Sequence, residues 1–175
     1  MKNDDIVITS AFRTAIGKFS GSLSSQTAPE LGSTVIKKCV ENSELKKEEV
    51  DMVYMGQVLT AGTGQNPARQ ASILAGLPHE TTNTTVNQVC GSGLASVALA
   101  YNSIKSGDGK LVIAGGQESM SNSPHYMNIR KGIKMGDGKM KDSMIIDGLW
   151  DAYNQYHMGI TAENVAEKFK IRREE

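Results

Sequence analysis

Apolar and polar residues follow two different periods along the first two-thirds of this chain. Short aliphatic or β-branched runs predict buried strands, whereas apolar residues at every third or fourth position predict helices. Strands are expected at residues 6–10, 50–58, 81–89 and 111–114. Helices are expected at residues 28–42, 67–75 and 94–104. Strands that alternate with helices indicate an α/β architecture.

The pattern changes after Gly116. Residues 117–142 are rich in Met, Ser, Gly and Lys and show weak periodicity. A short helix is expected at 143–152, and a last helix is expected to begin at Ala162 with Thr161 as its N-cap. That last helix has no Gly or Asn to end it, so we expect the sequence to be a piece of a longer protein.

The composition argues against several classes of protein, among them nucleic-acid-binding, membrane-spanning and zinc-binding proteins. Lys plus Arg and Asp plus Glu both number 19, which argues against a nucleic-acid partner. No apolar run reaches the roughly 20 residues of a membrane helix, and no secretory signal opens the chain. The two cysteines and three histidines lack the spacing of a zinc site, so we expect free thiols in a reducing cytoplasm.

Cys90 is the residue most suited to chemistry. It follows the strongest predicted strand, precedes a predicted helix, and is followed directly by Gly91-Ser92-Gly93. The N-terminus of a helix favours a thiolate, and its N–H groups can hold an oxyanion. The spacing equally allows a cysteine that only fills the core. Cys39, by contrast, lies on the apolar side of a predicted helix and is expected to serve packing alone.

Other candidate motifs carry less information. The glycines near 62–64 lack the third glycine of a dinucleotide fingerprint, and no Walker A sequence occurs. The basic stretch at 130–141 suits either a phosphorylated ligand or a solvated loop. His157 and Met158 precede the last helix, where either a structural or a ligand-facing role is possible.

Five segments in order resemble the thiolase family of acyl-CoA acyltransferases. The segment from Asn87 to Gly93 resembles the surroundings of the acyl-accepting cysteine in that family. The other four are 13–19 (RTAIGKF), 64–70 (GQNPARQ), 114–121 (AGGQESMS) and 156–164 (YHMGITAEN). They cover nearly the whole chain, and five ordered motifs are far more specific than any one of them.

The resemblance implies a layered α-β-α fold and a reaction. A cysteine thiolate attacks acetyl-CoA, and the acyl-enzyme then reacts with a second acetyl-CoA to give acetoacetyl-CoA and CoA; thiolysis is the reverse. It implies that Cys90 is the nucleophile and that its N–H contributes to an oxyanion hole. His157 and Met158 match positions that line the acyl end of the substrate pocket, and this pair resembles the short-chain biosynthetic type.

The resemblance also divides the chain. Residues 1–116 match the N-terminal α/β domain, and residues 117–175 match the beginning of a loop domain for substrate binding and tetramer formation, with the tetramer loop at 124–141. The family's activating histidine and second cysteine lie in a further half, so the isolated chain is expected to be inactive. The parent is expected to be a homotetramer without metal or tightly bound cofactor, since CoA is part of the substrate.

Three alternatives stay open at this point. The chain can belong to a 3-ketoacyl-CoA thiolase of fatty-acid degradation instead of an acetyl-CoA acetyltransferase. It can belong to another condensing enzyme of the same superfamily, which would lack the second reactive cysteine. It can also be a non-enzymatic truncated fragment that binds a full-length partner through its basic loop. A second reactive cysteine in the missing half would distinguish a thiolase from another condensing enzyme. Size analysis of the purified chain would test whether it is a fragment that binds a partner.

Overall fold

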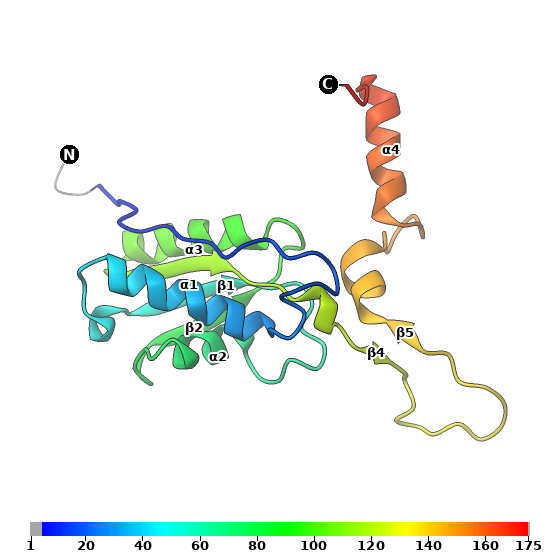
Figure 1. Cartoon of the computed structure of the whole chain (residues 1–175), viewed down its shortest axis with the longest axis horizontal. Coiled ribbons are helices and arrows are strands. Elements are labelled where there is room, and N and C mark those ends of the chain that lie inside the picture. The colour runs from blue at the N-terminus through cyan, green and yellow to red at the C-terminus, as the bar shows by residue number, and fades with distance from the viewer. Residues whose placement is uncertain (1–4, 175) are drawn as a thin grey trace. The chain divides into compact units, whose positions relative to one another are not determined.

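A sheet of three parallel strands forms the centre of the first part of the chain in the computed structural model, which describes residues 5–174. The strands are β1 (Met52–Gly56), β2 (Thr82–Val86) and β3 (Val112–Gly116), in the order β2–β1–β3 (Figure 1). Met52 pairs with Thr82 on one side and with Val112 on the other. All three strands therefore end at the same edge of the sheet.

Helices cover both faces of this sheet. The helices α1 (Ala28–Asn42) and α2 (Pro67–Leu74) pack together on one face, and α3 (Ser92–Ser106) packs on the other (Figure 1). Side chains of β1 alternate between the faces. Val53 and Met55 are buried in a core with Ile36 of α1, whereas the Tyr54 hydroxyl lies 2.9 Å from Ser103 Oγ of α3. The layered α-β-α prediction is confirmed.

Helix α1 has the predicted bounds because its sequence specifies its start. Thr27 is the N-cap, and its hydroxyl accepts a hydrogen bond from the Glu30 N–H. The Glu30 carboxylate accepts in return from the Thr27 N–H at 2.7 Å, which completes a capping box. Pro29 lies in the first turn, where its missing N–H costs nothing.

The strand predicted at residues 6–10 does not form. This segment forms neither a helix nor part of a sheet, and Ile8 is 80% exposed. A strand exists only where a neighbouring segment takes up its backbone groups, and none among residues 5–174 pairs with this one. The apolar pattern was therefore insufficient to predict a strand here.

The chain divides after Asn122 into two compact units. Short 3₁₀ turns at Lys47–Glu49 and Met120–Asn122 belong to the first. The second contains the antiparallel pair β4 (His125–Tyr126) and β5 (Lys141–Asp142), the π-helix η3 (Met144–Leu149) and α4 (Met158–Phe169). The helix predicted at 143–152 is thus largely a π turn and is shorter than expected.

Helix α4 begins earlier than the sequence predicted. His157 is its N-cap, and Nδ1 of that ring accepts a hydrogen bond from the Gly159 N–H at 3.0 Å. Thr161, the predicted cap, lies inside the helix, and its hydroxyl oxygen is buried without a partner among the described residues. The prediction was wrong because a histidine side chain took the acceptor role that Ser, Thr, Asp and Asn usually fill.

Candidate active site

Cys90 lies in a short turn that joins the end of β2 to the start of α3. Strand β2 ends at Val86, three residues before the predicted end, and α3 begins at Ser92. The intervening residues, Asn87 to Gly91, are all exposed, and Cys90 is a free and exposed thiol. The predicted position of this cysteine between a strand and a helix is therefore confirmed.

Hydrogen bonds hold the turn around Cys90 in one conformation. The Gln88 N–H donates to Ser92 Oγ at 2.8 Å, and the Val89 N–H donates to Asn87 Oδ1 at 3.0 Å. The N–H groups of Gly91 and Ser92 donate to the carbonyls of Gln88 and Val89. No hydrogen bond from the Cys90 N–H to another of the described residues is found. Among the N–H groups of residues 88–92, it is therefore the donor that a ligand could use.

Val89 has a backbone conformation that a β-branched residue rarely adopts. Its φ is +48°, in the left-handed region that favours glycine. Such outliers persist only where the surrounding structure determines them, and they cluster at functional sites. Here the outlier immediately precedes the candidate nucleophile, and the hydrogen bonds of the turn surround it.

Glycines at the ends of the strands allow α3 to approach the sheet closely. A Cβ atom on Gly56, the last residue of β1, would lie 2.6 Å from the Ser92 carbonyl carbon and 2.8 Å from the Gly93 nitrogen. On β3, a Cβ atom on Gly116 would lie 3.6 Å from Gly93 Cα. The N-terminus of α3, and with it the Cys90 turn, is thus placed directly against the edge where the strands end.

Glu118 supports a second loop beside this turn. Its carboxylate accepts hydrogen bonds from the N–H groups of Val58 at 2.8 Å and Leu59 at 3.1 Å. Burial raises the pKa of this carboxyl group, although those two hydrogen bonds act in the opposite direction. Asn87 Nδ2 lies 3.5 Å from Val58 O, which connects this loop to the Cys90 turn.

Three of the residues that shape this site are not identifiable from the sequence pattern. They are Val89, Ser92 and Glu118, all of which lie within the segments that resemble thiolases. Their place inside segments that resemble thiolases is the one signal that could have identified them. A single sequence does not indicate that a valine has a left-handed backbone or that a carboxylate is buried. The other cysteine, Cys39, is half-buried on α1.

His157 and Met158 are adjacent at the start of α4, in the second unit of the chain. Since Nδ1 of His157 accepts a hydrogen bond, the proton of the neutral ring resides on Nε2, on the exposed side chain. Met158 is 39% exposed and lines an apolar hollow along α4 with Ala162, Val165 and Ile171. The structure thus brings these two residues together, whereas Cys90 belongs to the first unit.

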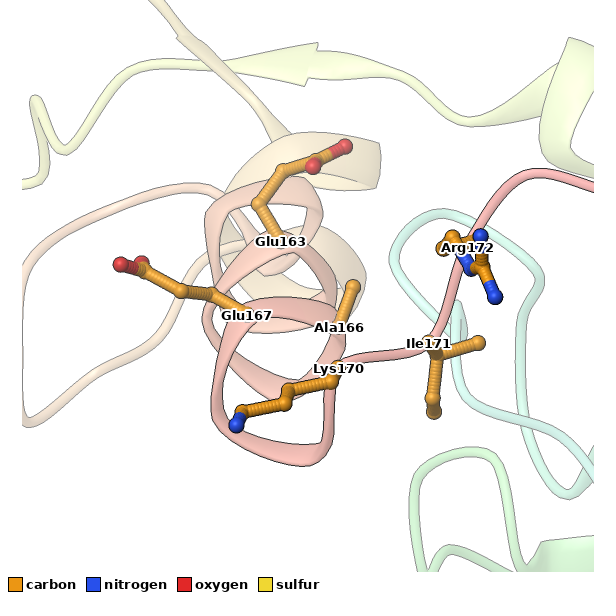
Figure 2. Close-up of a pocket in the computed structure, with 6 residues that line it drawn as sticks. All are labelled: Glu163, Ala166, Glu167, Lys170, Ile171 and Arg172. Atoms are coloured by element: carbon orange, nitrogen blue, oxygen red, sulfur yellow. The ribbon is translucent and has the colours of Figure 1, made fainter.

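A second hollow lies at the C-terminal end of α4, and its lining is charged. Figure 2 shows Glu163 and Glu167 on the helix, Lys170 at its end, and Ile171 and Arg172 on the segment that follows. It contains no cysteine, serine or threonine side chain, so it carries none of the chemistry considered for Cys90.

Residues 5–174 show neither a metal site nor a membrane helix. No three His, Cys, Asp or Glu side chains of this range are grouped so that they could hold a metal ion. None of the helices in the same range has both the length and the apolar character needed to cross a lipid bilayer.

Comparison with known proteins gives one consistent family. Residues 6–175 match the model of the family described as thiolase, N-terminal domain. The chain is 61% identical over 171 residues to an acetyl-CoA acetyltransferase of Cupriavidus necator, an alignment that covers 97% of this chain and 44% of that protein. It is 51% identical over 172 residues to a cytosolic acetyl-CoA acetyltransferase of Rattus norvegicus, covering 98% of this chain and 43% of that protein. The chain spans less than half the length of these relatives.

Proposed function

This chain belongs to the thiolase family, and from that premise we propose that it supplies the nucleophile-bearing part of an acetyl-CoA acetyltransferase. The observation that carries the proposal is the Cys90 turn. The exposed Cys90 thiol and an N–H of the same residue, for which no acceptor is found among the described residues, directly precede the N-cap of a 15-residue helix. One residue therefore supplies both a nucleophile and an oxyanion donor, which are two of the groups that acyl transfer uses.

In the first step, the Cys90 thiolate attacks the carbonyl carbon of acetyl-CoA. A bond forms between Sγ and that carbon, and the carbonyl electrons move onto oxygen, where the Cys90 N–H can donate to them. When the carbonyl re-forms, the bond to the CoA sulfur breaks. The CoA thiolate leaves and takes up a proton, and Cys90 carries the acetyl group as a thioester.

In the second step, a second acetyl-CoA loses a proton from the carbon beside its carbonyl. The resulting carbanion attacks the acetyl-enzyme, a carbon–carbon bond forms, and the Cys90 thiolate leaves. The products are acetoacetyl-CoA and the free enzyme, and thiolysis runs the same steps backwards. The base for this proton and the histidine that activates Cys90 belong to the further half that the family resemblance implies.

The same family membership supports the remaining assignments that we propose. Residues 117–175 form the beginning of a loop domain, in which His157 and Met158 line the acyl end of the pocket. The apolar hollow beside Met158 suits a short acyl group. The segment 124–141 contributes to a homotetramer, and the protein works in the cytoplasm. The 175-residue chain alone is inactive as a thiolase.

The exposed apolar side of α3 supports the need for a further half. Leu94 is 77% exposed and Tyr101 is 50% exposed, on a helix with only one charged residue, Lys105. An apolar helix face of this kind usually marks a surface that another element covers. We propose that the second half of the enzyme packs there.

The test compares the 175-residue chain with a joined enzyme, in which the chain continues into the C-terminal part of the Cupriavidus necator relative. Each is incubated with acetyl-CoA, and the acetylated residue is found by intact mass and peptide mapping. We expect acetylation of Cys90 and formation of acetoacetyl-CoA in the joined enzyme alone. Cys39→Ala is the matched control and retains both, whereas Cys90→Ala loses both.

Two results would contradict the proposal. One is a folded joined enzyme that stays active after Cys90→Ala. The other is robust acetoacetyl-CoA cleavage by the 175-residue chain alone, which would show that no further half is needed.

A further inference from the structure

We propose that Ser92 is a positioning residue for Cys90, whose hydroxyl clamps the turn and holds Val89 in its left-handed conformation. The inference rests on the proposed function of Cys90 as the acyl-accepting nucleophile. Ser92 itself touches no reacting atom in this scheme. It acts on the direction of the Cys90 N–H and thiol.

The Ser92 hydroxyl bridges two points of the turn at once. Its oxygen accepts a hydrogen bond from the Gln88 N–H at 2.8 Å, and its O–H donates to the Val89 carbonyl at 2.6 Å. The side chain is only 4% exposed, so water cannot easily replace either bond. The residues on both sides of the peptide bond between Gln88 and Val89 are thus fixed to the first residue of α3.

Ser92 is itself held by the sheet. The absence of a side chain on Gly56 lets the backbone of Ser92 lie against the end of β1. One turn further along α3, the Ser96 hydroxyl donates to the Ser92 carbonyl at 2.9 Å. The clamp therefore has a rigid base, whereas the turn that it holds is exposed.

The conformation of Val89 needs such a clamp. A β-branched residue at φ +48° is disfavoured, and without a restraint it returns to negative φ. That rotation would turn the following peptide group, which contains the Cys90 N–H. Asn87 Oδ1 restrains the N–H side of Val89, and Ser92 restrains its carbonyl side.

The kinetic test uses Ser92→Ala in the joined enzyme. We expect kcat for acyl transfer to fall on the order of 10- to 100-fold, because misplacement by about 1 Å has this effect, while KM for acetyl-CoA changes little. Ser103→Ala is the matched control, since it removes another hydroxyl of α3, which lies eleven residues beyond Ser92 and 2.9 Å from the Tyr54 hydroxyl. We expect it to keep the wild-type kcat.

A rescue experiment separates positioning from general destabilisation. Glycine adopts positive φ without strain, so Val89→Gly should make the clamp dispensable and restore much of the activity of Ser92→Ala. Val89→Ala keeps the strain and should not. A merely structural role of Ser92 predicts no difference between these two double variants.

An NMR measurement on the 175-residue chain keeps the inference independent of activity. The distance between the amide and α protons of Val89, measured by the nuclear Overhauser effect, is short at positive φ and longer at negative φ. We expect the short distance in the wild type and in Ser103→Ala but not in Ser92→Ala. Unchanged φ in Ser92→Ala, or kcat within about twofold of wild type, overturns the inference. A wild-type joined enzyme that never acetylates Cys90 refutes the proposed function instead, and the NMR comparison still decides the clamp.

Discussion

Replacing Gly56 by alanine should destabilise the first unit through steric overlap with the start of α3. The new Cβ would lie 2.6 Å from the Ser92 carbonyl carbon, 2.7 Å from Ser92 Cβ and 2.8 Å from the Gly93 nitrogen. Two of these three are backbone atoms of α3, which cannot move aside as the end of a flexible side chain can. The sheet and the helix must therefore separate locally.

The size of the effect follows from overpacking. Adding one carbon to a tightly packed site costs about 1–3 kcal/mol. Gly56 is not among the glycines with a positive φ, so alanine can adopt its backbone conformation. The whole penalty is therefore steric. A loss of about 2 kcal/mol lowers the folding equilibrium constant about 30-fold.

Gly115→Ala is the matched control, one residue earlier on the neighbouring strand. Its Cβ would meet Met55 Sδ at 3.5 Å and Cε at 3.8 Å, which are ordinary contacts with a flexible side chain. We expect its free energy of unfolding to stay within about 0.5 kcal/mol of wild type.

Urea unfolding followed by far-UV circular dichroism measures both variants. Tryptophan fluorescence does not suit the purpose, because the one tryptophan, Trp150, lies in the second unit. Equal stability of Gly56→Ala and Gly115→Ala would refute the close approach of α3 to β1.

Three further predictions concern single side chains. Thr27→Ala breaks the capping box and should cost about 1 kcal/mol in urea unfolding, whereas Thr34→Ala, on the exposed surface of the same helix, should cost little; equal losses would contradict the cap. Burial raises the pKa of Glu118, so its contribution to stability is greatest at acidic pH and falls as the pH rises through that pKa; Glu118→Gln should remove this decline, and an unchanged pH profile of unfolding would count against it. Thr161→Val removes a buried hydroxyl without a partner and should stabilise the second unit by up to about 1 kcal/mol in thermal unfolding; a loss of stability would show that the hydroxyl is satisfied.

The sequence predicted best those elements whose signals are local. The start of α1 follows from Thr27, Pro29 and Glu30, which all lie in its first turn or just before it. The strand predicted at 6–10 failed because strand formation depends on a partner, and an apolar pattern carries no information about one. The predicted start of α4 was wrong because His157, and not Thr161, is the N-cap.

In the candidate site, the position of the cysteine could be predicted from the sequence, but the geometry around it could not. The position of Cys90 between a strand and a helix followed from β-branched residues on one side and glycines on the other. Its geometry did not, because the φ of Val89 contradicts the intrinsic preference of valine and is imposed by Asn87 and Ser92. Side-chain hydrogen bonds within the turn impose that conformation, and the intrinsic preference of valine alone would have predicted the opposite.

The central place of β1 also determines how the sheet can assemble. Met52 pairs with Thr82 and with Val112, which follow it by thirty and by sixty residues. Doubling a closed loop costs only about 0.6 kcal/mol more in chain entropy, so loop length hardly favours one edge strand over the other. Neither edge strand can pair before β1 is in place, because both pair with β1 alone. Parallel pairing over such separations is intrinsically slow. Substitutions in Met52–Gly56 should therefore slow folding more than equally destabilising substitutions in either edge strand.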